Sequence, residues 1–144
     1  MTQPEVSVIV PVYNAGKFLE YTLNAVKKQT LTNIEIICVN DGSTDNSADI
    51  LQAFSKRDKR FKIFSQPNQG GSAARNRGLE EASGKYIAFL DNDDIYHPRY
   101  LEILLANLQK TDSDISCCAY RKFYGAEDYS FTETYEKSNL CRQL

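Results

Sequence analysis

The sequence lacks the residues on which several common kinds of site depend. It contains one histidine, His97, and no GxSxG segment, which argues against a Ser-His-Asp nucleophile. No GxGxxG follows the first apolar run, and Gly84-Lys85 precedes an apolar run, so neither a dinucleotide fingerprint nor a P-loop is present. None of the four cysteines belongs to a CxxC pair, which argues against a zinc site and indicates reduced thiols.

Strong net charge and long hydrophobic runs are lacking too. The formal net charge is −2, which argues against a nucleic-acid partner and against a general binder of membrane surfaces. Val6–Val12 is far too short to cross a bilayer, so we expect no transmembrane or targeting segment in this chain and a cytoplasmic location. The densest basic run, residues 56–60, is typical of a solvated helix end, with an anion or membrane contact as the alternative.

Two hydrophobic periods alternate along the chain and predict its fold. Five short, nearly continuous apolar runs are typical of strands buried on both faces: Val6–Val12, Ile34–Val39, Phe61–Phe64, Tyr86–Leu90 and Ile115–Tyr120. Amphipathic stretches lie between them, with Leu19, Thr22, Leu23 and Val26 on one helical face and Leu101, Leu104, Leu105 and Leu108 on another. The pattern predicts an α/β fold with a Rossmann-like, doubly wound, mostly parallel sheet and helices on both faces.

Local signals place the helix ends. We expect one helix to begin near Ser43 or Thr44 with Asp45 in its first turn, and Pro98 to take the first position of another. A further helix is predicted over residues 72–82, ended by Ser83-Gly84. Residues 1–120 form one predicted domain; residues 121–144 break the pattern, and we expect them to begin an acceptor-side region that is poorly ordered.

Polar loops follow four of the predicted strands. They read "PVYNAG", "NDGSTD", "QPNQGG" and "DNDD", and ligands of open α/β sheets bind beyond the carboxyl ends of the strands. Tyr13 could pack on a flat base, Asp41 could accept from a ring N–H, and "DNDD" could hold Mg²⁺ or Mn²⁺ beside a diphosphate. Taken singly, each loop is also an ordinary turn, helix cap or hydrated loop; their common edge favours a binding site.

These motifs together strongly resemble family 2 glycosyltransferases of the GT-A fold. The resemblance covers residues 5 to about 120 and rests on "VSVIVPVYNAGKFLEYTLNAVKKQTLTNIEIICVNDGSTDNS" and on "NQGGSAARNRGLEEASGKYIAFLDNDD". It implies inverting transfer of a sugar from a nucleotide diphosphate donor, usually with Mg²⁺ or Mn²⁺, to a glycan or lipid-linked acceptor. A UDP-sugar donor and a role in bacterial polysaccharide or glycoconjugate synthesis are implied only because they are common among members of the family.

The resemblance assigns roles position by position. Those implied for the nucleobase and its pocket fall on Pro11, Tyr13, Asn14, Asp41 and Gly42. The third motif, which lines the donor site in the family, corresponds to Asn68, Gly70, Arg75 and Asn76. Asp91-Asn92-Asp93 matches the family's DxD motif. Asp93 would be the direct metal ligand, while Asp91 and Asn92 would serve the ribose, the phosphates or the metal's waters.

Two departures from the family pattern stand out. Many relatives carry two aspartates where this chain has Asn40-Asp41. The family's general base is a later carboxylate, about a hundred residues beyond the DxD motif, whereas 51 residues follow Asp93. Glu127-Asp128 comes too early and is more typical of an exposed acidic loop.

We therefore expect the donor-binding half of a transferase, incomplete at its C-terminus, without the general base and a poor catalyst by itself. A non-catalytic nucleotide-sugar-binding module is the alternative. A pyrophosphorylase-like enzyme fits worse, because "PVYNAGK" has one glycine and one lysine where a phosphate loop would be needed. A homodimer and peripheral attachment of the full-length protein to the inner face of the membrane stay open.

Overall fold

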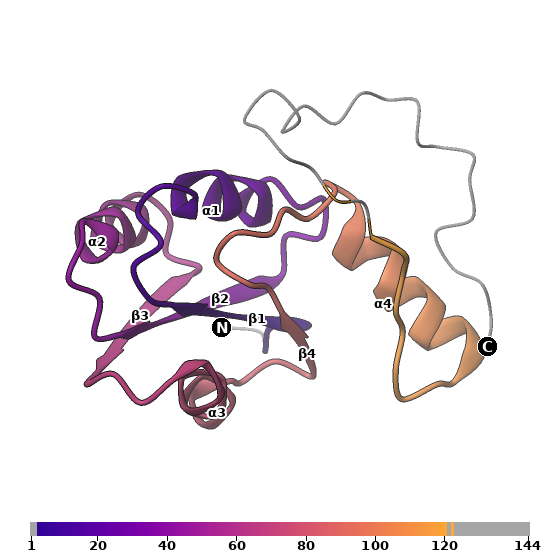
Figure 1. The fold of residues 1–144 in the computed structure, drawn as a ribbon. Coiled ribbons are helices and arrows are strands. Elements are labelled where there is room, and N and C mark those ends of the chain that lie inside the picture. Colours follow the sequence, from indigo (N-terminus) through magenta and orange to yellow (C-terminus); the bar gives the residue numbers. More distant parts are fainter. Residues whose placement is uncertain (1–2, 121, 123–144) are drawn as a thin grey trace.

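The computed structural model describes residues 3–120 and 122 (Figure 1). Strands and helices alternate along this part of the chain. They are β1 (Val6–Val12), α1 (Leu19–Lys27), β2 (Ile34–Asp41), α2 (Ser47–Arg57), β3 (Phe61–Gln66), α3 (Gly71–Glu81), β4 (Tyr86–Phe89) and α4 (Tyr100–Thr111). The strands form one sheet in the order β3-β2-β1-β4, and every neighbouring pair is parallel. The α/β fold with a parallel sheet is therefore confirmed.

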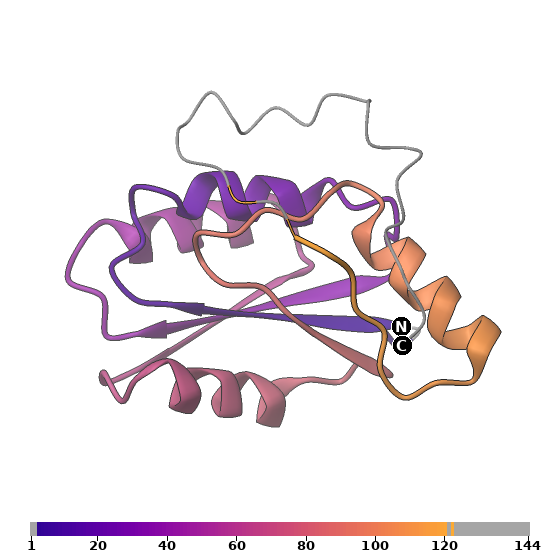
Figure 2. The same cartoon turned by 45° about the vertical axis from the view of Figure 1, so that its right-hand side comes forward.

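Helices cover both faces of the sheet. Helices α1 and α2 lie on one face and α3 on the other, with α4 beyond the β4 edge (Figures 1 and 2). Because side chains alternate along a strand, Val8 and Val10 of β1 pack in the larger core under α1 and α2, whereas Ile9 packs with Ile37 and Ala74 under α3. The near-continuous apolar runs of β1 and β2 thus serve two cores.

Helix α3 lies close to the sheet because of a glycine inside the helix. A Cβ atom added at Gly78 would overlap with Cγ2 of Ile9. Glycine inside a helix costs about 1 kcal/mol relative to alanine. At Gly78 the missing side chain allows the α3 backbone to pack directly on Ile9 of β1. This contact fixes the position of the first turn of α3 relative to the strand ends.

Several predicted boundaries need correction. The predicted strand Ile115–Tyr120 is wrong: the segment has no strand structure, and Ile115 and Tyr120 are 82% and 85% exposed. An apolar run becomes a strand only where a neighbour completes its ladder, and none of the four described strands pairs with this one. Helix α2 begins at Ser47 rather than at Ser43 or Thr44, and α4 begins at Tyr100, two residues after Pro98.

The remaining boundaries lie close to expectation. Helix α3 covers residues 71–81 instead of 72–82, and the predicted apolar faces of α1 and α4 point inward, with Leu19, Leu23, Leu101 and Leu105 buried. Apart from Lys122, the predicted acceptor-side region 121–144 lies outside the described residues. No helix in the described part of the chain is long and apolar enough to cross a membrane.

Glu35 is a buried carboxylate near the start of β2. Its side chain is 4% exposed and pairs with Lys62 Nζ at 2.6 Å. Its other oxygen accepts hydrogen bonds from Ser7 Oγ at 2.5 Å, from the Ser83 amide at 2.7 Å and from the Gly84 amide at 3.1 Å. Burial opposes ionisation, but Lys62 and these donors outweigh it and lower the pKa of Glu35 from 4.5 to about 2. Glu35 therefore ties β1, β3 and the α3–β4 connection to β2.

We predict that Glu35→Gln lowers the free energy of unfolding at pH 7 by about 2–3 kcal/mol, because the charge that pairs with Lys62 is lost. Since the folded-state pKa lies below the unfolded one, the contribution is complete above about pH 4.5 and disappears as the pH falls toward about 2. Urea denaturation across this range measures it, with Glu20→Gln on the exposed side of α1 as control. A wild-type-to-variant difference that is independent of pH would contradict the assignment.

Candidate functional site

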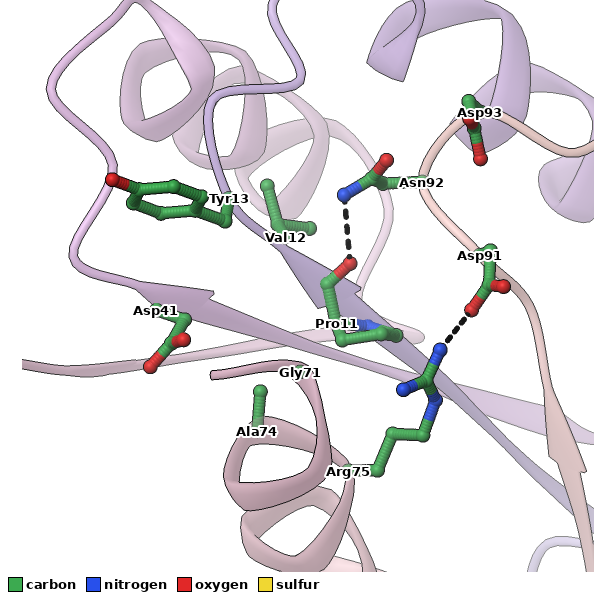
Figure 3. A pocket seen from close by; sticks show the side chains of 10 residues that line it. All are labelled: Pro11, Val12, Tyr13, Asp41, Gly71, Ala74, Arg75, Asp91, Asn92 and Asp93. Carbon is green, nitrogen blue, oxygen red and sulfur yellow. Dashed lines mark hydrogen bonds and ion pairs between the residues drawn. The ribbon is translucent and has the colours of Figure 1, made fainter. Parts of the chain in front are cut away.

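A cleft of about 240 Å³ lies at the carboxyl ends of β1, β2 and β4 and beside the first turn of α3 (Figure 3). Ten residues line it: Pro11, Val12, Tyr13, Asp41, Gly71, Ala74, Arg75, Asp91, Asn92 and Asp93. They come from four segments that are far apart in sequence. The parallel sheet brings these segments to one edge, as the crevice rule for open α/β sheets requires.

Seven of the residues that the sequence pointed to lie around this cleft: Pro11, Tyr13, Asp41, Arg75, Asp91, Asn92 and Asp93. Tyr13 is 48% exposed and lies across the cleft from Asp91, Asn92 and Asp93 in Figure 3. Residues 91–94 are called the acidic turn below. Five others do not line the cleft: Asn14, Gly42, Asn68, Gly70 and Asn76. Of these, Asn76 is exposed on α3, and the other four hold the loops around the cleft in place.

Asp41 is the buried charge of the cleft. The residue is 2% exposed, and its Oδ1 accepts hydrogen bonds from Gln66 Nε2 at 2.8 Å and from the Gln69 amide at 2.9 Å. Its Oδ2 accepts from the Gly70 amide at 2.8 Å. Burial opposes ionisation, but the three donors outweigh it and lower the pKa of the carboxyl below its usual value. Asp41 is thus ionised at neutral pH and anchors the loop that leads into α3.

Asn14 joins the loop after β1 to the loop after β2. Its backbone amide donates to Ser43 Oγ at 3.1 Å, and its side-chain Oδ1 accepts from the backbone amide of Thr44 at 2.8 Å. Two further hydrogen bonds join the same two loops: the backbone amide of Gly16 donates to Asp45 Oδ2, and that of Ala15 donates to Ser47 Oγ. Asn14 has a φ of 47°, a left-handed conformation that asparagine tolerates better than most residues. It therefore positions Tyr13 from behind the cleft.

Gly42 allows the loop between β3 and α3 to approach the end of β2. Its φ is 71°, and an added Cβ would lie 2.8 Å from the backbone nitrogen of Asn68. Asn68 Oδ1 in turn accepts from the Gly70 amide at 3.3 Å, the same amide that binds Asp41. Gly42 and Asn68 thus hold the entrance to α3 against the end of β2.

Asn92 holds the acidic turn in place. Asn92 Nδ2 donates to the carbonyl of Pro11 at 3.2 Å, and the carbonyl of Asn92 accepts from Thr22 Oγ1 at 3.0 Å. The bond to Pro11 is drawn in Figure 3. Asn92 is therefore tied to β1 and α1, while the carboxylates on either side of it, Asp91 and Asp93, face the cleft.

Repulsion within the acidic turn is only partly relieved by the protein. Arg75 of α3 pairs with Asp91 Oδ1 at 2.5 Å. Partial desolvation and the charges of Asp93 and Asp91 raise the pKa of Asp94. No group of three or more His, Cys, Asp or Glu side chains in the described residues is arranged to hold a metal ion. The oxygen donors of Asp93 and Asp91 nevertheless fit a hard cation that takes its other ligands from water and phosphate.

Two positioning residues were missed from the sequence. Thr22 was assigned to the apolar face of α1, yet its hydroxyl holds the acidic turn; a fully buried threonine among leucines and valines must find a hydrogen-bond partner, which is a usable signal. Gln66 ends β3 and holds Asp41. Nothing local in the sequence marks Gln66, because its role depends on strand register.

Comparison with known structures defines the class of protein. The structure of S. aureus TarS in complex with UDP-GlcNAc is similar, with a TM-score of 0.71 and 34% identity over 76% of this chain and 32% of that chain. The mannosyltransferase PcManGT from Pyrobaculum calidifontis, solved with GDP-Man and Mn²⁺, shares the fold at a TM-score of 0.66 and 24% identity over 90% of this chain and 38% of that one. The fold is that of the GT-A glycosyltransferases.

Sequence comparison then gives the family. The family model described as glycosyl transferase family 2 matches residues 7–140, and the chain belongs to this family. The glycosyltransferase GlyG of Streptococcus pneumoniae is 46% identical over 111 residues, which are 76% of this chain and 37% of that protein. GlyA of the same organism is 42% identical over 127 residues, 88% of this chain and 18% of that protein. The chain thus spans little more than a third, or less, of these relatives.

We predict that Thr22→Val loosens the acidic turn, because valine keeps the shape of threonine but cannot donate to the Asn92 carbonyl. The expected cost is about 1 kcal/mol of folding stability and a several-fold loss of Mn²⁺ affinity. Thermal denaturation and Mn²⁺ titration measure the two effects. Thr111→Val is the matched control, since it removes a hydroxyl-to-carbonyl bond at the end of α4. Equal Mn²⁺ affinities in both variants would show that Thr22 does not position the turn.

Proposed function

We propose that the cleft binds the nucleoside diphosphate part of a sugar donor, most simply a UDP-sugar. The observation that carries the proposal is the convergence of Tyr13, Asp41 and Asp93 on one cleft at the carboxyl edge of the sheet. Similarity to TarS, whose structure holds UDP-GlcNAc, supports uridine as the nucleoside. In the whole protein the sugar would pass with inversion to a hydroxyl of a glycan or lipid-linked acceptor.

The nucleoside would lie between Tyr13 and Asp41. Tyr13 offers a half-exposed ring against which a base can pack, and the ionised carboxylate of Asp41 offers an acceptor for a ring N–H. Pro11 and Ala74 contribute apolar lining to the same cleft. The base end of the cleft is therefore built around an acceptor rather than a donor, which favours bases that carry a ring N–H.

The diphosphate would lie toward Arg75 and the acidic turn. Asp93, together with Asp91, would hold Mg²⁺ or Mn²⁺, and such an ion supplies positive charge to the departing diphosphate. Arg75 pairs with Asp91 in the described structure and lies on the same wall, so it can also reach an anion in the cleft. Asn92, held by its own hydrogen bonds, positions both carboxylates.

Deprotonation of the acceptor hydroxyl would need a further carboxylate, because Asp41, Asp91 and Asp93 of the cleft would already serve the base and the ion. We propose that a segment outside residues 3–120 provides it. Glu127 and Asp128 lie outside the described residues. Removing a general base leaves donor binding intact and costs about 10²–10⁴ in rate. The described part would thus bind donor without rapid transfer.

We predict that UDP binds this chain with a 1:1 stoichiometry and that Mn²⁺ strengthens binding about tenfold or more, because the ion links the diphosphate to Asp93. Isothermal calorimetry with UDP, with and without Mn²⁺, measures the coupling. Asp93→Asn should remove most of the Mn²⁺ effect, whereas Asp114→Asn, an exposed position beyond α4, should leave it unchanged.

The absence of any heat of UDP binding to the wild-type chain would contradict the proposed function. An Mn²⁺ effect that survives Asp93→Asn undiminished would instead contradict the metal assignment alone.

A further inference from the structure

The side chain of Gln66 holds Asp41, the buried hydrogen-bond acceptor of the cleft. Asp41 and Gln66 are register partners in the β2–β3 pair, so the sheet itself places them side by side. Val39 and Phe64 pack in the core under α3, and the two-residue period puts Asp41 and Gln66 on that same face. The Gln66 Nε2 to Asp41 Oδ1 bond of 2.8 Å follows from this placement.

The three donors leave the carboxylate little freedom. A carboxylate has about four acceptor positions. Oδ1 uses two, on Gln66 Nε2 and the Gln69 amide, and Oδ2 uses one, on the Gly70 amide. One acceptor position therefore remains, on Oδ2 of a residue that lines the cleft.

Only one of these three bonds comes from a side chain. The amides of Gln69 and Gly70 belong to the backbone and are present whatever residue stands there, unless it is proline. Gln66 is half-buried and does not line the cleft. Its substitution therefore removes one hydrogen bond to Asp41 without removing a group that lines the cleft.

We propose that Gln66 is a positioning residue that sets the nucleobase selectivity of the cleft, an inference that rests on the proposed function. By fixing Oδ1, Gln66 presents the last acceptor position of Asp41 in one direction. A base with a ring N–H, such as uracil, can donate to it. Cytosine has an unprotonated ring nitrogen at the same position and meets a fixed negative charge. Sites built for a hydrogen bond reject a ligand that cannot make it.

Binding of UDP and CDP in the presence of Mn²⁺ tests the proposal. Gln66→Met keeps the length of the side chain and removes the donor, so Asp41 gains freedom to turn. UDP affinity should fall about 3- to 10-fold while CDP affinity changes less than about twofold, so that selectivity falls. Gln69→Met is the matched control, since Gln69 serves Asp41 through its backbone, and it should retain wild-type selectivity.

Two readouts separate positioning from a purely structural role. Thermal denaturation shows whether Gln66→Met is folded; if it is not, Gln66→Ala at the same half-buried strand end replaces it. The carboxyl resonance of Asp41, followed by NMR, should titrate at a higher pH in the variant than in the wild type, because a stabilising hydrogen bond is lost.

Selectivity equal to that of the wild type, or equal losses of UDP and CDP affinity, would overturn the role of Gln66. Failure of the wild-type chain to bind either nucleotide would instead refute the proposed function. In that case an Asp41 titration that shifts on Gln66 substitution would still establish the contact itself.

Discussion

Parallel pairing of β1 with β2 on one side and β4 on the other is the constraint on which the candidate site depends. Val12 lies beside Asn40 and Ile9 beside Phe89, so the three strands end within a few residues of one another. Their loops must then meet at one edge, and a 3.2 Å hydrogen bond joins Asn92 to Pro11, 81 residues earlier in the chain. The cleft is a consequence of strand register before it is a consequence of any single side chain.

Residues around the cleft fall into two groups with different physical tasks. Tyr13, Arg75 and Asp93 face the cleft and leave ring, guanidinium or carboxylate groups accessible there. Behind them, a second group of side chains forms hydrogen bonds with the backbone of the loops: Asn14, Asp45, Ser47, Asn68 and Thr22. Gln66 instead donates to the Asp41 carboxylate. Asp41 belongs to both groups, since it lines the cleft and also binds two loop amides. Such loops stay in place without regular secondary structure because their polar groups have partners.

The sequence predicts the four strands, the helices between them and the edge at which the polar loops gather, because continuous apolar runs and helical faces are local patterns. Burial on both faces holds for β1 and β2 only, since β3 and β4 lie at the edges of the sheet and carry exposed residues. The sequence is less informative about polar residues whose hydrogen-bond partners are distant in the chain. Asn40 and Asp41 extend β2 beyond its apolar run. Helix α2 begins at Ser47 rather than at Ser43 or Thr44, and the Asp45 and Ser47 side chains accept hydrogen bonds from the loop after β1. Ile115–Tyr120 fails for the opposite reason: an apolar run has no strand beside it in the described chain. The sequence marks Thr22 only as a threonine that needs a hydrogen-bond partner, and it does not mark Gln66 at all, because the partner of each residue is brought near by the fold.

The central claim is that one nucleoside diphosphate and its ion fill the cleft between Tyr13, Asp41 and Asp93. A crystal structure of this chain with UDP and Mn²⁺, with anomalous scattering used to locate the ion, tests the claim most directly. We expect uracil packed beside Tyr13, its ring N–H directed at Asp41, and a manganese peak at Asp93. Ordered UDP at another surface with an empty cleft, or a manganese peak remote from Asp93, would contradict it.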